Sequence, residues 1–126
     1  MMPPILRALG LLALAATTAD ATVLPLKPGT FVLKDQPCAS PPFAATFDYD
    51  GRAFSYPHAS HCISTTLSHV GRTYRQRETC SALGDGAPAT PVTTVSTYQV
   101  VLRTEVRVSH GPRHAMSSYR WCPASK

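Results

Sequence analysis

The sequence of 126 residues lacks the motifs that would assign an enzymatic activity. It has no Gly-x-Ser-x-Gly nucleophile elbow, no His-Glu-x-x-His zinc helix and no Cys-x-x-Cys redox motif. The glycines at 84 and 86 lack the spacing and the lysine of a phosphate-binding loop. The sequence therefore gives no support to an enzyme, and it predicts no bound cofactor.

Long apolar runs are also missing. A helix needs roughly twenty apolar residues to cross about 30 Å of hydrocarbon, and no segment of the chain provides them. The short run from Ala8 to Ala16 follows Arg7, and Ala19-Asp20-Ala21 has small residues where a signal peptidase reads them. We expect residues 1–21 to be a cleaved signal peptide and residues 22–126 to form one exported domain, periplasmic or extracellular.

Acidic residues are few, so the charge balance is basic. The sequence has seven acidic side chains and twelve lysines and arginines, which gives a formal net charge of +5. A basic surface favours anionic partners such as an acidic protein or a glycan. Nucleic acid is not expected as a partner, because export separates the protein from it and no aromatic-basic recognition motif is present.

Four cysteines in an exported chain of this size predict two disulfides. They are Cys38, Cys62, Cys80 and Cys122. Three connectivities are open, and among them we favour Cys38–Cys62 with Cys80–Cys122.

Apolar and polar residues alternate with a period of two, which is typical of half-buried β-strands. The longest such stretch runs from Tyr98 to His110, with a bend or a hairpin near Leu102 to Thr104 as an alternative. Other hairpins are predicted with turns at Asp50-Gly51, at Gly71-Arg72 and at Gly111-Pro112. No segment after the signal peptide has helical periodicity. We therefore expect an all-β fold, a small antiparallel meander of six to eight strands that closes as a barrel or a sandwich and is stabilised by disulfides.

The predicted turns also assign residues to faces of the sheet. A type I′ turn at Asp50-Gly51 places Tyr49 opposite Arg52, and Phe47 opposite Phe54. A type II′ turn at Gly71-Arg72 places Ile63 opposite Cys80, on one face with Leu67 and Tyr74.

The strand from Thr73 to Cys80 is polar on both faces, which is typical of an edge strand. On such a strand Glu78 leans out to solvent. A buried Glu78 would instead be a candidate for proton transfer, although no second acid matches it.

Arginines provide the predicted binding site. The register of the last hairpin sets Arg103 across from Arg120, and like charges opposed across strands cost stability that an anion would relieve. The predicted partner-binding face consists of Arg75, Arg77, Arg103, Arg107 and Arg120. The leading hypothesis is a non-enzymatic exported binding module for an anionic protein or glycan, a class that includes inhibitor-like proteins.

Two alternatives remain open. Imidazole and thioether groups suit copper or zinc, and the candidate ligands are His58, His61, His110, His114 and Met116. A periplasmic metal-binding protein is therefore the second hypothesis, and a small hydrolase is the third.

Overall fold

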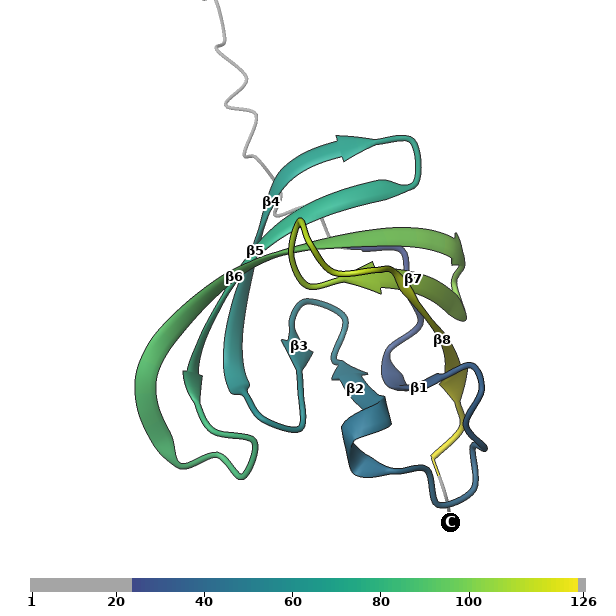
Figure 1. The fold of residues 1–126 in the computed structure, drawn as a ribbon, viewed down its shortest axis with the longest axis horizontal. Helices are drawn as coiled ribbons and strands as arrows, with labels where there is room; N and C mark the ends of the chain where they lie inside the picture. The colour runs from purple at the N-terminus through teal and green to yellow at the C-terminus, as the bar shows by residue number, and fades with distance from the viewer. Residues whose placement is uncertain (1–23, 125–126) are drawn as a thin grey trace, which may run out of the picture.

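The structure is a computed structural model that describes residues 24–124, so the predicted signal peptide lies outside the described residues. Eight antiparallel strands form one sheet that curls into a nearly closed barrel (Figure 1). The strands are β1 (Gly29–Leu33), β2 (Thr46–Tyr49), β3 (Phe54–Ser55), β4 (Ser60–Val70), β5 (Thr73–Ala82), β6 (Pro88–Leu102), β7 (Glu105–Ser109) and β8 (Ser117–Cys122). A 3₁₀ turn, η1 (Phe43–Ala45), precedes β2.

The strand order around the sheet is β3-β2-β1-β8-β7-β6-β5-β4. From β1 to β3 and from β4 to β8 each strand therefore pairs with its neighbours in sequence, and β1 pairs with β8 to join the two groups into one sheet. At the seam between β3 and β4 the pairing is reduced to one bridge, between Tyr56 and Ala59. Pro57 lies between them and has no N–H to extend the ladder. The predicted antiparallel meander is confirmed, and it closes as a barrel.

Aromatic side chains fill the barrel interior beside β1, β2 and β3. Phe31 stacks on Phe47 with ring centroids 5.2 Å apart, and Phe54 stacks on Tyr98 at 4.6 Å. Tyr49 is also buried, and its hydroxyl donates to the Leu24 carbonyl at 3.1 Å. On β2 the buried Phe47 and Tyr49 alternate with the more exposed Thr46 and Asp48, so this strand turns one face to the core.

The first predicted turn is two residues too short. Tyr49 faces Phe54 rather than Arg52, because the loop runs from Asp50 to Ala53. Asp50 Oδ1 accepts hydrogen bonds from the backbone N–H groups of Arg52 and Ala53, which holds the longer loop. A shift of two residues keeps every side chain on its predicted face.

The second hairpin begins as predicted but changes register. Val70 pairs with Thr73 across the Gly71-Arg72 turn, and a bulge at Leu67 then shifts the ladder by one residue. Beyond the bulge, Cys62 rather than Ile63 faces Cys80. A shift of one residue turns side chains to the opposite face, and Ile63 is 73% exposed as a result.

The favoured disulfide pairing is wrong. The bulge sets Cys62 directly across from Cys80, and these two form one disulfide. Cys38 pairs with Cys122 across 84 positions of sequence. The segment that carries Cys38 folds back over β8, where the Gln36 carbonyl accepts a hydrogen bond from Arg120 Nη2 at 2.7 Å. Two disulfides are typical of a protein in an oxidising compartment.

The stretch from Tyr98 to His110 is a hairpin rather than one strand. The chain turns at Arg103-Thr104, so that Leu102 at the end of β6 pairs with Glu105 at the start of β7. Of the alternatives that the sequence left open, the hairpin is the correct one. Across residues 24–124, no helix has the length and apolar character needed to span a membrane.

Candidate functional site

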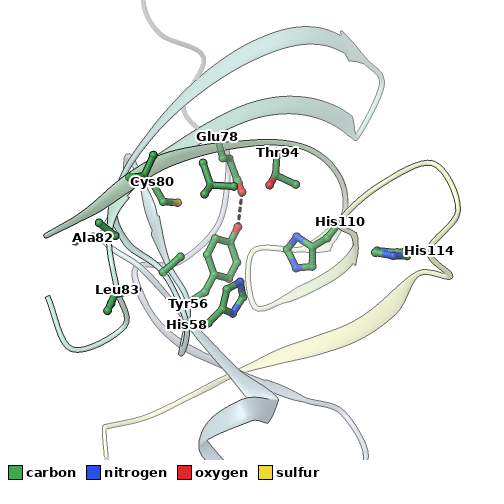
Figure 2. Close-up of a pocket in the computed structure, with 13 residues that line it drawn as sticks. Tyr56, His58, Glu78, Cys80, Ala82, Leu83, Thr94, His110 and His114 are labelled. Atoms are coloured by element: carbon green, nitrogen blue, oxygen red, sulfur yellow. Dashed lines mark hydrogen bonds between the residues drawn. The ribbon is translucent and has the colours of Figure 1, made fainter. Parts of the chain in front are cut away.

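A cavity of about 480 Å³ occupies the part of the barrel that the aromatic core does not fill (Figure 2). Its walls come from the seam between β3 and β4, from β5 and β6, and from the β7–β8 connection. The lining residues are Tyr56, His58, Ala59, Glu78, Cys80, Ala82, Leu83, Ala89, Thr90, Val92, Thr94, His110 and His114. Most of these side chains are apolar or small.

Period-two alternation explains the wall that β5 and β6 provide. Glu78, Cys80 and Ala82 alternate along β5 and point to the same side. Opposite them on β6, Thr94 pairs with Glu78 and Val92 pairs with Cys80. The Cys62–Cys80 disulfide ties this wall to β4.

Glu78 is buried, so its predicted exposure on an edge strand is wrong. The strand β5 lies between β4 and β6, and β4 is the strand at the seam. The residues of β5 that point inward are Tyr74, Gln76, Glu78, Cys80 and Ala82, and Glu78 is only 2% exposed. The polarity of this inner face misled the sequence-based assignment, since polar groups inside a barrel are compatible with burial when they are hydrogen-bonded.

Three hydroxyl groups hydrogen-bond to the Glu78 carboxylate. Tyr56 donates to Oε2 at 2.7 Å, and Tyr98 donates to Oε1. The Ser96 hydroxyl is the third partner. Figure 2 shows Tyr56 reaching up from the cavity with its hydroxyl directed at the carboxylate.

Burial governs the protonation of this cluster. It raises the pKa of Glu78, and the three hydroxyl donors offset only part of that effect. Burial also raises the pKa of Tyr56 and the pKa of Tyr98 well above their usual value, with the neighbouring carboxylate adding to both shifts. Both tyrosines therefore remain neutral hydrogen-bond donors at neutral pH.

His110 extends the cluster along the cavity wall. Its Nδ1 lies 3.0 Å from Ser96 Oγ, and its ring meets Tyr56 edge to face at 5.2 Å. Burial lowers the pKa of His110, and the nearby His58 and His114 lower it further. His110 is therefore neutral at neutral pH.

The predicted metal ligands are only partly brought together. His58, His110 and His114 all line the cavity. His61 is exposed on β4 with a positive φ of 51°, and Met116 is half-buried in the β7–β8 connection. Among the residues that the structure describes, no three His, Cys, Asp or Glu side chains are grouped to hold a metal ion.

The predicted repulsion between Arg103 and Arg120 does not occur. The β7–β8 connection is longer than a two-residue turn, so Arg120 pairs with Glu105, and Arg103 lies in the exposed β6–β7 turn. Arg75 and Arg77 are exposed on the outer side of β5. Arg107 is exposed on β7, where it donates to Gln99 Oε1 at 3.2 Å.

The fold and the site together define a small disulfide-bonded β-barrel with an internal, mainly apolar cavity and a buried carboxylate on its wall. No family model, curated protein or solved structure matches the chain.

Sequence reasoning did not find the roles of Tyr56, Tyr98 and Ser96. A signal was present for Glu78, because it has the same parity along β5 as Tyr74 and Cys80.

Proposed function

We propose that the protein is a non-enzymatic binding module whose ligand is a small molecule held in the cavity of the barrel. The cavity of about 480 Å³ is the observation that carries this proposal. Small-molecule sites are concave, have volumes of roughly 300–1,000 Å³, and combine apolar walls with a few convergent polar groups. The cluster around Glu78 supplies such groups on one wall.

Exposed apolar side chains at the cavity give further support. Leu83 is 49% exposed and Val92 is 63% exposed, although both line the cavity. A ligand that covered them would remove apolar surface from water, which is worth about 25 cal/mol for each Å². We also propose that the protein works in the periplasm or outside the cell, which its two disulfides support.

Titration with N-phenyl-naphthylamine, a neutral probe that fluoresces in apolar surroundings, tests this function. We expect saturable fluorescence at a stoichiometry of one probe to one protein. Ala89→Trp should abolish the signal by filling the cavity, and Ala87→Trp, two residues earlier in the β5–β6 connection and outside the lining, should retain it. Equal signals from both variants would show that the probe binds elsewhere, and an absence of saturable binding to the unmodified protein would refute the proposal.

An anionic partner on the outer surface is the second candidate function. Arg75 and Arg77 are exposed, and the only ion pair within residues 24–124 joins Lys34 to Glu105. These arginines are therefore not neutralised by a carboxylate, and guanidinium groups bind carboxylates and sulfates in a bidentate manner. For each charge removed, Arg75→Gln with Arg77→Gln should weaken binding to dextran sulfate more than the exposed variant Arg113→Gln does. Equal weakening per charge would indicate only a general charge effect.

A further inference from the structure

The carboxylate on the cavity wall has no basic partner. Its hydrogen-bond donors are the neutral hydroxyls of Tyr56, Tyr98 and Ser96. Within residues 24–124 no lysine, arginine or histidine forms an ion pair with Glu78. A buried carboxylate without a counter-charge is costly, since hydroxyl donors replace only part of its hydration. A cation that entered the cavity would offset that cost.

The other polar groups of the cavity wall also accept hydrogen bonds. The Ser96 hydroxyl has one proton, which it donates to the Glu78 carboxylate, so its oxygen accepts from the Nδ1–H of His110. A neutral His110 in that tautomer has an unprotonated Nε2, which is an acceptor. The proton of Tyr56 is engaged with Glu78, and its oxygen also hydrogen-bonds with the Tyr98 hydroxyl, so Tyr56 offers the cavity no free donor. A ligand that satisfies these groups must therefore be a hydrogen-bond donor.

The remaining walls suit an apolar ligand body. Tyr56 and His58 present stacked rings, with centroids 5.9 Å apart, and the face of a tyrosine ring attracts a cation. Ala82, Leu83 and Val92 line the cavity beyond them. The negative charge of Glu78 would repel a carboxylate in this apolar enclosure, which provides discrimination against anions.

From these observations we infer that the cavity selects a small organic cation, a protonated amine on an apolar body, with Glu78 as its counter-ion. The inference rests on the proposed binding function and names the ligand class of the same cavity. The ammonium group would lie beside the Glu78 carboxylate and next to Tyr56, and the apolar body would cover Leu83 and Val92.

Isothermal titration calorimetry with three probes of one shape tests the inference at about pH 8, where an alkylamine is protonated. The probes are phenethylammonium, phenethyl alcohol and hydrocinnamate. We expect the ammonium to bind at least tenfold more tightly than the alcohol, which corresponds to about 1.4 kcal/mol, and hydrocinnamate to bind more weakly than either. In Glu78→Gln the preference for the ammonium should disappear, whereas Asp85→Asn, which removes an exposed carboxylate outside the lining, should keep it.

A second variant covers the case in which Glu78→Gln fails to fold. Thr94 pairs with Glu78 across β5 and β6 and lines the cavity, so Thr94→Lys places an ammonium beside the carboxylate. It should reduce phenethylammonium affinity at least tenfold, while Thr93→Lys, on the exposed side of β6, should leave it unchanged.

These experiments distinguish a failure of the cation inference from a failure of the proposed small-molecule binding in the cavity. If the ammonium and the alcohol bind equally, or if Thr94→Lys leaves ammonium affinity intact, the cation inference is wrong and cavity binding stands. The cation inference is also wrong if N-phenyl-naphthylamine binds and the ammonium does not. If neither binds, the binding function itself is refuted.

Discussion

Removing one hydroxyl from the Glu78 cluster should cost stability in a way that depends on pH. Tyr98 is fully buried, and its hydroxyl donates to Glu78 Oε1. Tyr98→Phe deletes that donor together with the hydrogen bond between the Tyr98 and Tyr56 hydroxyls, and it keeps the ring that stacks on Phe54. The carboxylate would then retain only Tyr56 and Ser96 as donors.

The size of the effect follows from the charge of the acceptor. A hydrogen bond to a charged group contributes about 1.5–3 kcal/mol, and a bond between neutral groups contributes about 0.5–1.5 kcal/mol. Tyr98→Phe should therefore destabilise the fold by about 1.5–3 kcal/mol where Glu78 is ionised. Where Glu78 is protonated the cost should fall to the neutral range. Tyr49→Phe is the matched control, because the Tyr49 hydroxyl donates to a neutral backbone carbonyl.

Urea unfolding of both variants and the unmodified protein, at about pH 4 and about pH 8, measures these costs. The first condition lies below the ordinary pKa of a glutamate, and the second lies well above it. The cost of Tyr98→Phe should increase with pH, and the cost of Tyr49→Phe should not. If the two variants lose the same free energy at both conditions, Glu78 is not ionised in the fold, and its proposed role as a counter-ion is refuted.

Three further changes test the site and the fold. Burial raises the pKa of Glu78, so the folded state holds the Glu78 proton more tightly than the unfolded chain does. The stability of the unmodified protein should therefore fall as pH rises through that pKa, and thermal melts of Glu78→Gln should lack this decline. Replacing Cys62 and Cys80 by Ala removes a disulfide with a sequence separation of 18, which should lower the free energy of unfolding in urea by about 3 kcal/mol. Non-reducing peptide mapping that found another partner for Cys62 would contradict the fold. Gly84→Ala would bring a Cβ within 1.7 Å of the Pro57 carbonyl oxygen, so the cavity rim must move. N-phenyl-naphthylamine should then bind more weakly, and unchanged binding would show that this contact does not shape the cavity.

The sequence predicted the fold class because alternation is a local property. Each strand carries its own period-two pattern, and the predicted meander required only that neighbours in sequence pair. Both hairpins with misjudged turn lengths kept their predicted faces, because their registers moved by two residues. Tyr49 thus faces Phe54 inside the barrel, and Val106 faces Tyr119.

Period-two alternation does not predict register shifts of one residue or pairings between segments that are distant in sequence. The bulge at Leu67 has no glycine or proline to mark it, yet it exchanges Ile63 for Cys62 on the inner face and thereby selects a disulfide. The pairing of Arg120 with Glu105 depends on the length of an irregular connection, which alternation does not encode. The arginine repulsion inferred from the sequence failed for that reason.

The candidate site was hidden for a related reason. Glu78, Ser96, Tyr98 and His110 come from β5, β6 and the end of β7, which pair as neighbours in sequence, whereas Tyr56 reaches them only because the barrel closes. Along β5 alone, a glutamate that follows Arg75, Gln76 and Arg77 is typical of a solvated edge strand. Once the sheet curls into a barrel, the face of β5 that carries Glu78 points to the interior, and the buried carboxylate requires donors that the other segments supply.

The position of this carboxylate sets it apart from a purely structural polar residue. A neutral acceptor such as glutamine at residue 78 could also receive these hydroxyl hydrogen bonds without the desolvation cost of a charge, so the fold itself does not require a carboxylate there. Glu78 lies at the boundary where the packed core ends and the cavity begins, and its oxygens are held by side chains from both sides of that boundary. Tyr98 belongs to the core, and Tyr56 and His110 belong to the cavity wall. Residues of the core thus hold the carboxylate in place, and the cavity leaves it accessible to a bound ligand. A preorganised site for a cationic ligand requires this arrangement.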